Sequence, residues 1–584
     1  MPVLKRRVIG CRSAGPKLKI LLALSFLSIL LSPWIPPTLV KASPATLYVP
    51  SPQYPTIQSA VAAASTGDSI IISSGSYAEN VVINKSLVLT GAGNSSTFID
   101  GQGIGPGISI VGTRDVAVSG FTIRNPGVYN SSVLVISSFE ISLSQNVLVG
   151  SSKQSNGTTI YNSNGVAVLR SVITGNLYGI AIQGGFDNTI QEDNSTSNAI
   201  GLGIFNSTGN IVKLNVFRYG SEGVRVWYQG ATGNLVTRNL IANNSLAGIS
   251  MLSSGNNMIV GNEIAFNDVS STSEGIYLSD STGNRIYYNN IRNNTIQMFG
   301  VYTSDMTGNV WSDGTTYPKG NFWSNYNGTD SNNDGVGDTN LPWPCPKGGP
   351  VCSGSRLPGV DQYPLMKPWT YSSLVVTATA QPTSGCPLTL NVSFSGSVRN
   401  GAPPYSYDWN FADGGSSTGQ NVTHVYAVRG TFFASLTVTD SSTSNGTDII
   451  PITVFPGGLI LRVVNGQTAV LGANVTFTGQ PPGQRPNGEL TNQQGLAAFP
   501  CLAPGSYAIE ISSPGYVASR ASFTVANQTV NLTVRLVPVA SGLSVVLLAG
   551  VGIAAALAAM LVGFLFVRRR RSRMIRGGSR PVKR

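Results

Sequence analysis

A glycine followed by alternating apolar residues returns six times in the middle of the chain, between about residues 165 and 311. A second phrase, led by asparagine as in Asn210-Ile-Val212, follows each occurrence after a few polar residues. The period is about 22 to 27 residues, which predicts a repeat architecture. The six occurrences are Gly179-Ile-Ala-Ile182, Gly201-Leu-Gly-Ile204, Gly223-Val-Arg-Val226, Gly248-Ile-Ser-Met251, Gly275-Ile-Tyr-Leu278 and Gly300-Val-Tyr302.

Each period contains three short apolar pieces, and none of them is long enough for a helix. Their apolar residues alternate with polar ones, as strands require. Three strands per period, stacked on the next period about 4.8 Å away, predict a right-handed parallel β-helix. The residues expected to point outward include Ala181, Arg225 and Tyr277. The interior residues are predicted to be Ile180, Ile182, Val224, Val226, Ile276 and Leu278.

The two basic ends of the chain indicate membrane targeting. The formal net charge is +12, but seven basic residues lie in the first 41 positions and nine in the last 17. Residues 1–42 resemble a secretory signal peptide, with an uncleaved anchor as the alternative. Residues 543–567 form an uncharged run long enough for one transmembrane helix, and the basic tail 568–584 is then expected in the cytoplasm. These features predict a single-pass cell-surface protein with an extracellular body and no nucleic-acid partner.

The start and the end of the repeats carry recognisable closing segments. A short helix beginning after Thr56 is predicted to cover the open first coil. The segment from Tyr54 to Gly91 resembles the opening of pectin-lyase-like β-helix proteins. Residues 46–369, ending with phrases such as Asp361-Gln-Tyr-Pro-Leu-Met366, resemble the NosD-like branch of this fold. That resemblance implies copper, but the single histidine of the sequence lies outside the β-helix and offers copper no ligand cluster.

Two further domains follow. Tyr407-Asp-Trp-Asn-Phe-Ala-Asp-Gly414 and Thr423-His-Val-Tyr426 resemble the PKD domain, an Ig-like β-sandwich, over residues 373–455. Ala412 stands where this motif usually has glycine, and His424 is expected to be a structural residue. Residues 457–537 resemble the carboxypeptidase regulatory-like domain, a second β-sandwich. The predicted fold class is therefore all-β, with a β-helix, two sandwiches and one C-terminal transmembrane helix.

Cysteines and glycosylation sequons agree with an exported protein. Cys345 and Cys352 flank a Pro/Gly loop that a disulfide could close. Cys386 and Cys501 lie in different domains, and they are expected either to pair or to remain two buried thiols. Asn-x-Ser/Thr sequons recur along the body, and glycosylation is predicted at Asn206, Asn243 and Asn327.

One loop near the end of the β-helix has the spacing of a calcium-binding loop. Side-chain oxygens at the first, third, fifth and ninth positions, a glycine at the sixth and a carbonyl at the seventh are the ligands that calcium loops use. Position 12 is Leu341 rather than Glu, so weak calcium binding is expected, and a polar turn without metal is the alternative. The predicted ligands are Asp330, Asn332, Asp334, Val336 and Asp338.

Stacked coils place equivalent residues in files on the outer surface, and two such files are rich in aromatic residues. Rings beside charged groups on a long face suit a glycan, because the rings pack on sugar C–H groups while the charged groups bind hydroxyls. An outer sheet face with incidental aromatic residues is the alternative. The residues predicted to bind a glycan or another surface molecule are Phe205, Arg225, Trp227, Tyr277 and Tyr302.

A polysaccharide lyase, hydrolase or epimerase is the rival interpretation. Glu222 and Glu274 share one file position two coils apart, or about 10 Å, at the upper edge of the separation for an inverting hydrolase. Arg225 lies beside them, whereas the adjacent Glu192 and Asp193 are expected on opposite faces. The sequence favours adhesion or glycan binding over catalysis by Glu222, Glu274 and Arg225. A structural envelope component without a ligand is the third interpretation.

Overall fold

The described part of the computed structural model runs from residue 43 to residue 539. It excludes residues 152–153, 268–270, 272, 302–307, 342, 344–360, 371–373, 388, 456, 482–483, 485 and 526–528. The chain divides into the units Met1–Ala45 and Thr46–Arg584. Within the described residues no helix is long and apolar enough to cross a membrane. The predicted signal peptide, the transmembrane segment 543–567, the basic tail and both Cys345 and Cys352 lie outside the described residues.

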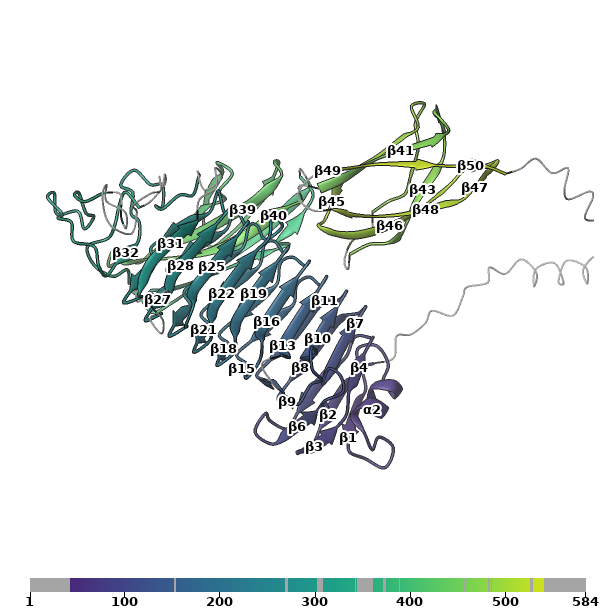
Figure 1. Ribbon diagram of the computed structural model, residues 1–584, viewed down its shortest axis with the longest axis horizontal. Coiled ribbons are helices and arrows are strands. Elements are labelled where there is room, and N and C mark those ends of the chain that lie inside the picture. The colour runs from purple at the N-terminus through teal and green to yellow at the C-terminus, as the bar shows by residue number, and fades with distance from the viewer. Residues whose placement is uncertain are drawn as a thin grey trace, which may run out of the picture. The chain divides into compact units, whose positions relative to one another are not determined.

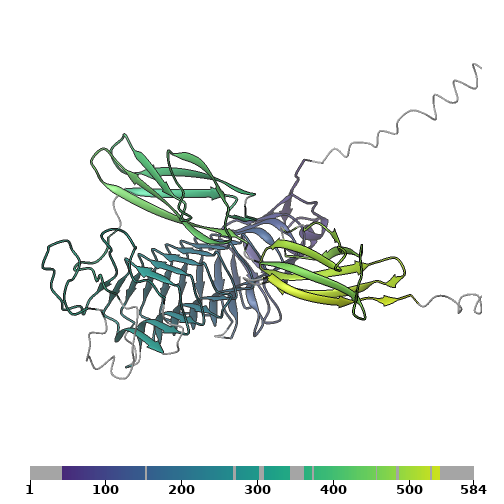
Figure 2. The same cartoon turned by 90° about the horizontal axis from the view of Figure 1, so that it is seen from above.

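Residues 46 to 323 form a parallel β-helix with three sheets, and its coils stack along one axis (Figures 1 and 2). Sheet A has eleven strands: β1 (Thr46–Val49), β2 (Ser69–Ile72), β5 (Val88–Gly91), β8 (Arg114–Ser119), β11 (Phe139–Ser144), β14 (Ala167–Leu169), β17 (Thr189–Gln191), β20 (Ile211–Lys213), β23 (Leu235–Thr237), β26 (Met258–Val260) and β29 (Arg285–Tyr287). Sheet B also has eleven: β3 (Gly75–Ala78), β6 (Thr97–Asp100), β9 (Thr122–Arg124), β12 (Val147–Val149), β15 (Val172–Thr174), β18 (Asn194–Thr196), β21 (Val216–Arg218), β24 (Leu240–Ala242), β27 (Glu263–Ala265), β30 (Asn290–Arg292) and β32 (Phe322–Trp323). Sheet C has ten: β4 (Val81–Ile83), β7 (Ile108–Val111), β10 (Ser131–Ile136), β13 (Asn156–Tyr161), β16 (Tyr178–Gln183), β19 (Ile200–Phe205), β22 (Glu222–Trp227), β25 (Ala247–Leu252), β28 (Glu274–Ser279) and β31 (Ile296–Val301).

The interior of the β-helix is apolar and closely filled. All six residues predicted to point inward are at most 1% exposed, and they belong to one continuous core cluster. Arg225 and Tyr277 lie on the outer face as expected and are partly exposed. Ala181 is only 7% exposed because its neighbours cover it. The alternation in the sequence therefore predicted the two faces of sheet C.

A short helix closes the N-terminal end, as predicted. Helix α2 (Ile57–Ala63) lies at the first coils (Figure 1) and begins with Thr56 as N-cap. Its Gln58 side chain accepts from the backbone N–H of Val82 at 2.7 Å and donates to the Val82 carbonyl at 3.4 Å. Val82 belongs to β4, the end strand of sheet C. The side-chain amide of Gln58 thus takes the place of a neighbouring strand at this edge.

Buried asparagines line the corner between sheets A and B. The amide oxygen of Asn239 accepts from the backbone N–H and the side chain of Asn215, each at 3.0 Å. The side chain of Asn239 also donates to the carbonyl of Val212 at 2.9 Å. This pattern repeats from coil to coil and satisfies backbone groups that the corner leaves unpaired. We call the series the asparagine ladder; it consists of Asn215, Asn239, Asn262, Asn289 and Asn321.

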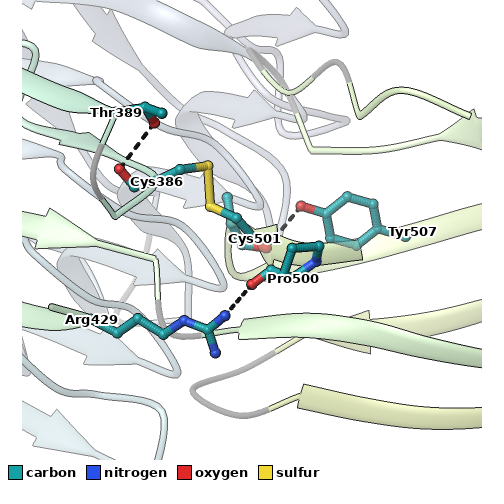
Figure 3. Close-up of a disulfide and its surroundings, with 7 residues drawn as sticks. Cys386, Thr389, Arg429, Pro500, Cys501 and Tyr507 are labelled. Carbon is teal, nitrogen blue, oxygen red and sulfur yellow. Dashed lines mark hydrogen bonds between the residues drawn. A yellow bond between two sulfur atoms is a disulfide. The ribbon is translucent and has the colours of Figure 1, made fainter. Parts of the chain in front are cut away.

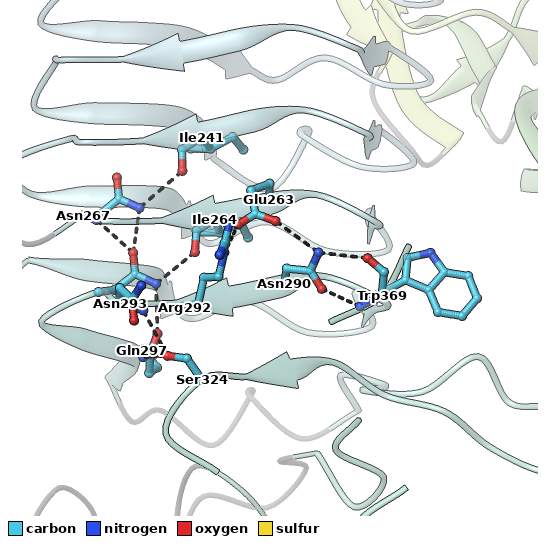
Figure 4. A network of polar contacts seen from close by, with 11 residues as sticks. Ile241, Glu263, Ile264, Asn267, Asn290, Arg292, Asn293, Gln297, Ser324 and Trp369 are labelled. Carbon is cyan, nitrogen blue, oxygen red and sulfur yellow. Dashed lines mark hydrogen bonds and ion pairs between the residues drawn. The ribbon is translucent and has the colours of Figure 1, made fainter. Parts of the chain in front are cut away.

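A second buried series lies at the corner between sheets B and C (Figure 4). Asn267 donates to the Ile241 carbonyl at 3.4 Å and to the amide oxygen of Asn294 at 2.8 Å. Asn294 in turn donates to Gln297 at 2.9 Å, and Gln297 donates to Ser324 at 3.1 Å. The series therefore ends on the closing segment of the β-helix rather than on solvent.

The segment after the last coil folds back onto the β-helix. Trp369 accepts from Asn290 at 3.0 Å through its carbonyl and donates to Asn290 at 2.7 Å through its backbone N–H (Figure 4). Its ring stacks on Tyr288 with 3.7 Å between centroids. Trp369 therefore lies against the outer surface of the last coils.

Two β-sandwich-like units follow. The first has the sheets β33 (Val375–Gln381), β35 (Leu390–Arg399), β38 (Asn421–Tyr426) and β34 (Ser384–Gly385), β40 (Asn445–Val454), β39 (Gly430–Thr439), β36 (Ser406–Asn410), β37 (Ser416–Thr418). The second has β42 (Thr468–Ala469), β41 (Gly457–Asn465), β45 (Leu496–Leu502), β49 (Thr529–Arg535), then β44 (Glu489–Leu490), β43 (Asn474–Gly479), β46 (Gly505–Ser512), β48 (Ser519–Val525), and the pair β47 (Tyr516–Val517), β50 (Val537–Pro538). Each unit has its own apolar core.

The single histidine has the structural role that the PKD resemblance implied. His424 Nε2 lies 2.7 Å from Asp413 Oδ2, and its ring stacks on Phe411 with 4.0 Å between centroids. Ala412 adopts φ 63°, a left-handed conformation that favours glycine. The usual glycine of this motif is explained by that backbone conformation, which Ala412 adopts at a cost of about 1 kcal/mol.

A disulfide joins the two sandwich units (Figure 3). Cys386 and Cys501 are bonded across 115 residues of sequence, so the pairing alternative is confirmed. Arg429 of the first unit donates to the carbonyl of Pro500 in the second at 2.6 Å. Such a bond between domains is stable in an oxidising compartment.

Candidate functional site

The outer face of sheet C carries three files of residues, one residue per coil. The first file contains Glu222, Ala247 and Glu274, the second contains Arg225, Ser250 and Tyr277, and the third contains Phe205, Trp227 and Leu252. These registers place the named residues in the predicted files, with the exception of Tyr302. Aromatic rings and charged groups therefore meet on neighbouring strands of one face.

The centre of this face is an aromatic cluster around one guanidinium group. The Arg225 guanidinium carbon lies 3.9 Å from the centroid of the Trp227 ring and 5.9 Å from that of Tyr178. Phe205 packs edge-on against Tyr178 with 5.6 Å between centroids. Trp227 donates through Nε1 to Ser250 at 3.1 Å. We call Tyr178, Phe205, Arg225 and Trp227 the aromatic cluster, and Tyr277 lies two coils from Arg225 in the same file.

Arg225 is held in place by hydrogen bonds to two residues, Glu222 and Tyr178. Its Nε donates to Glu222 at 2.9 Å, a second nitrogen donates to the other Glu222 oxygen at 2.5 Å, and Nη1 donates to the Tyr178 hydroxyl at 3.0 Å. Glu222 is only 3% exposed. A fork-to-fork pair of this kind fixes orientation as well as charge, so the guanidinium plane is set before a ligand arrives.

Glu274 differs from Glu222 although it occupies the same file. It is 9% exposed, and burial raises the pKa of its carboxyl, with a further rise from the charge of Glu222. The two carboxylates are separated by the coil of Ala247, and hence by about 10 Å. Glu222 is therefore bound on both oxygens by an arginine, whereas burial raises the pKa of Glu274.

The register corrects the prediction for Tyr302. The residue that pairs with Tyr277 is Phe299, not Tyr302, and the two rings stack with 6.2 Å between centroids. Tyr302 itself lies outside the described residues. Phe299 therefore extends the aromatic file that Tyr302 was expected to extend.

Tyr178 is a member of the site that the sequence interpretation missed. Its register partner is Ile200, which pairs in turn with Glu222, so Tyr178 belongs to the first file. The available signal was its position directly before Gly179, as Glu222 precedes Gly223. A residue two coils away was not expected to reach Arg225, but a tyrosine side chain is long enough to do so.

The predicted calcium loop is an exposed turn held by its own backbone. Asp330 accepts from the backbone N–H groups of Asp334 at 3.2 Å and of Gly335 at 2.9 Å. Asp338 accepts from Ser331 at 2.6 Å, and Asp334 accepts from Val336 at 2.8 Å. Across the described residues, no three His, Cys, Asp or Glu side chains converge as a metal site. Calcium binding by Asp330, Asn332, Asp334, Val336 and Asp338 stays a prediction.

The three predicted glycosylation asparagines have different surroundings. Asn206 and Asn327 are exposed, and Asn243 is half-buried. Asn206 and Asn243 adopt φ of 47° and 57° at corners of the β-helix, and Asn327 accepts from Asn340 at 3.0 Å. Glycosylation at these residues stays a prediction.

Three family models match consecutive parts of the chain. The model described as periplasmic copper-binding protein (NosD) matches residues 61–328, the PKD domain model matches 374–454, and the carboxypeptidase regulatory-like domain model matches 460–537. These matches confirm the three resemblances found in the sequence. No curated protein sequence matches the chain.

Solved structures with a similar β-helix include polysaccharide-acting proteins. The A-module of mannuronan C-5 epimerase AlgE4 of Azotobacter vinelandii is 14% identical over 43% of this chain and 93% of its own, with TM-score 0.28. Pectate lyase Pel9A is 14% identical over 47% and 81%, with TM-score 0.32. The polygalacturonase of Erwinia carotovora is 12% identical over 46% and 94%, with TM-score 0.31. TM-scores this low support no conclusion about function.

The residues of this chain do not fit the copper in the description of the NosD model. His424, the one histidine in the sequence, is engaged with Asp413 in the PKD domain, and Cys386 and Cys501 are bonded to each other. In the part of the chain that the structure describes, no cluster of three ligating side chains is present. Imidazole and thiolate ligands, which suit copper, are therefore not gathered in the described β-helix.

Proposed function

Since the chain combines a NosD-type β-helix, a PKD domain and a carboxypeptidase regulatory-like domain, we propose that it is an exported, membrane-anchored surface protein whose sheet C binds an extended glycan. The observation that carries the proposal is the aromatic cluster around Arg225. Rings on adjacent coils offer apolar faces for sugar C–H groups. Arg225, fixed by Glu222 and Tyr178, keeps its charge beside those rings.

Three features support the surface location. The Cys386–Cys501 disulfide suits an oxidising compartment. The basic apolar N-terminus resembles a secretory signal, and the uncharged run 543–567 followed by arginines suits an anchor with a cytoplasmic tail. A protein ligand on another surface molecule is the alternative partner, and a glycan array with the full-length protein distinguishes the two.

Replacing Trp227 by alanine is expected to weaken glycan binding about tenfold, because a stacking ring of this size contributes about 1.5 kcal/mol. The measurement is the dissociation constant of the full-length protein for the best array glycan, by calorimetry. Tyr317→Ala is the matched control, since Tyr317 is 80% exposed and lies outside sheet C. An equal loss of glycan affinity in both variants, or no loss of affinity in Trp227→Ala, would contradict the proposal that Trp227 belongs to the binding site.

Catalysis on a polysaccharide is the second candidate, and the unlike environments of Glu222 and Glu274 favour it. An acid and a base with separated pKa values are what glycoside hydrolysis uses. Arg225 occupies both oxygens of Glu222, however, which opposes a free general base. Assays for reducing ends and unsaturated products, on the glycans that bind, distinguish catalysis from binding. Activity lost in Glu274→Gln with retained affinity would establish the enzyme.

Weak calcium binding by the loop of Asp330 to Asp338 is a further part of the proposal. Calcium loops that lack the bidentate acid at position 12 are expected to bind in the millimolar range that extracellular modules use. Calorimetry with calcium should give a Kd of about 1 mM, and Asp334→Ala should abolish the heat. Absence of any heat in the unsubstituted protein would leave the loop as a plain turn.

A further inference from the structure

The ten strands of sheet C contain very few charged residues. Glu222, Arg225 and Glu274 are the only Asp, Glu, Lys or Arg residues within the strand bounds. The remaining outward positions are aromatic, aliphatic, Ser, Thr, Asn, Gln, Ala or Gly, as in Thr159, Gln183 and Ser250. A face of this length with a formal charge of −1 is unlike one built for a polyanion.

The single cation of this face is already neutralised. Both oxygens of Glu222 accept from Arg225, and the Tyr178 hydroxyl accepts from a third nitrogen. A ligand carboxylate would meet a guanidinium whose charge is already balanced by Glu222, which is 3% exposed. Displacing Glu222 would leave a buried carboxylate without its partner, which costs several kcal/mol.

The second acid adds repulsion rather than attraction. Burial raises the pKa of Glu274, and the nearby carboxylate of Glu222 raises it further. Protonated Glu274 can donate a hydrogen bond to a ligand hydroxyl, and ionised Glu274 can accept one. A ligand carboxylate over the same coil would instead raise the pKa of Glu274 further and weaken its own binding.

These observations distinguish two classes of polysaccharide. A polyuronate carries one carboxylate on every sugar, so a chain lying over several coils would bring several negative charges to a face whose one cation is occupied. A neutral glycan needs only ring faces and hydroxyl partners, which the aromatic cluster, Ser250 and Glu274 supply. We infer that the outer face of sheet C selects neutral glycans and rejects polyuronates. This inference rests on the proposed function of glycan binding.

The test compares the binding of one polysaccharide with and without its carboxylate charges. Polygalacturonate and the same polymer with its carboxyls fully methyl-esterified are titrated into the full-length protein, together with neutral xylan, mannan and β-glucan. The expected result is binding of at least one neutral polymer, with a dissociation constant that changes little with salt. Every polyuronate, alginate included, should bind at least tenfold more weakly than that polymer.

A variant of Glu274 separates charge selection from loss of the site. Glu274→Gln removes the ionisable carboxyl and keeps a side chain of the same shape that can hydrogen-bond. The ratio of the dissociation constant for polygalacturonate to that for the neutral polymer should therefore fall about threefold or more. Thr159→Gln, on the same face but five coils earlier in the order of β13 and β28, is the control and should leave this ratio of dissociation constants unchanged.

The outcomes are distinguishable. Tighter binding of polygalacturonate than of its ester would overturn the inference while leaving glycan binding intact. If no polymer and no glycan on the array binds the full-length protein, the proposed function itself is overturned. An unchanged ratio in Glu274→Gln would show that the charge of this carboxyl does not select the ligand.

Discussion

Asp361→Ala is expected to lower the free energy of unfolding of the last coils by about 3 kcal/mol. Asp361 ends the asparagine ladder: Oδ2 accepts from the backbone N–H of Asn321 at 2.7 Å, from its side chain at 3.3 Å, and from Trp323 Nε1 at 2.9 Å. Its other oxygen accepts from Tyr363 at 2.9 Å. Alanine would leave these buried donors without an acceptor, at about 1 to 3 kcal/mol each, offset in part by removal of a desolvated charge.

The chemistry of the ladder explains why its last member is an acid. Each asparagine accepts from the preceding coil through its oxygen and donates to the next one through its backbone N–H and one amide hydrogen, while the other amide hydrogen goes to a carbonyl of the preceding coil. The partner of the last asparagine has no further coil to donate to, so it needs only to accept. Burial nevertheless raises the pKa of Asp361 to about 6, because the hydrogen bonds to it recover only part of the desolvation cost. An acid is retained here although its ionised form is costly.

Hydrogen exchange of the full-length protein, read by mass spectrometry, is the measurement for Asp361→Ala. Peptides that cover β30 and β32 should exchange faster, while those of the PKD domain should not change. Gln362→Ala, at the exposed neighbouring position, is the control and should exchange as the unsubstituted protein does. If the peptides of β30 and β32 exchange at the same rate in Asp361→Ala as in the unsubstituted protein, this carboxylate is not needed to close the β-helix.

The periodicity of the sequence was sufficient to predict the β-helix but not the pairing of its last strand in sheet C, β31. Sequence alignment paired Gly300 with Gly275, whereas the structure pairs Gly300 with Leu278. A Cβ on Gly275 would lie 2.6 Å from the carbonyl oxygen of Gln297 in the next coil, and one on Gly248 would lie 2.6 Å from that of Gly275. Glycine is therefore favoured at Gly248 and Gly275 because another strand of sheet C follows each of them. β31 is the last strand, so Gln297 can stand at that position.

The candidate site was predictable in its membership but not in its electrostatics. File positions follow from the repeat, so Arg225, Trp227 and Tyr277 could be grouped from sequence. The pairing of Glu222 with Arg225 and the contact with Tyr178 depend on side-chain rotamers and on the backbone at Gly223, which is left out of the strand pairing together with Gly201. Spacing alone therefore could not show that the one cation of the face is neutralised.

Asp193→Asn is expected to stabilise the β-helix by about 3 kcal/mol at pH 8. Asp193 occupies the ladder position before Asn215: its Oδ1 accepts from Ser171 at 2.7 Å, and its backbone N–H donates to Asn215 at 2.9 Å. Its Oδ2 is buried without a hydrogen-bond partner. The equivalent side chain of Asn215 donates to the Ile190 carbonyl at 2.9 Å. Asparagine at 193 would donate in the same way to Val168, which pairs with Ile190.

The pH dependence of this effect has a defined sign. Burial raises the pKa of Asp193 to about 7, with a smaller rise from Glu192, whereas the unfolded chain titrates near 4. The folded state therefore holds the proton more tightly, and the stability of the unsubstituted protein increases as the pH falls from about 7 to about 4. The advantage of Asp193→Asn should shrink over the same range, because the amide does not titrate.

Asn215→Asp provides the reverse experiment at the adjacent position of the ladder. It places a carboxylate where Asn215 now donates to Ile190 and to Asn239, and it should lose about 3 kcal/mol at pH 8 and less at pH 5. Local opening free energies of the peptides around β17 and β20, measured by hydrogen exchange at both pH values, test the pair together. Equal stabilities of Asp193→Asn and the unsubstituted protein at pH 8 would mean that the buried carboxyl finds a partner or keeps its proton, and the argument from the ladder would fail.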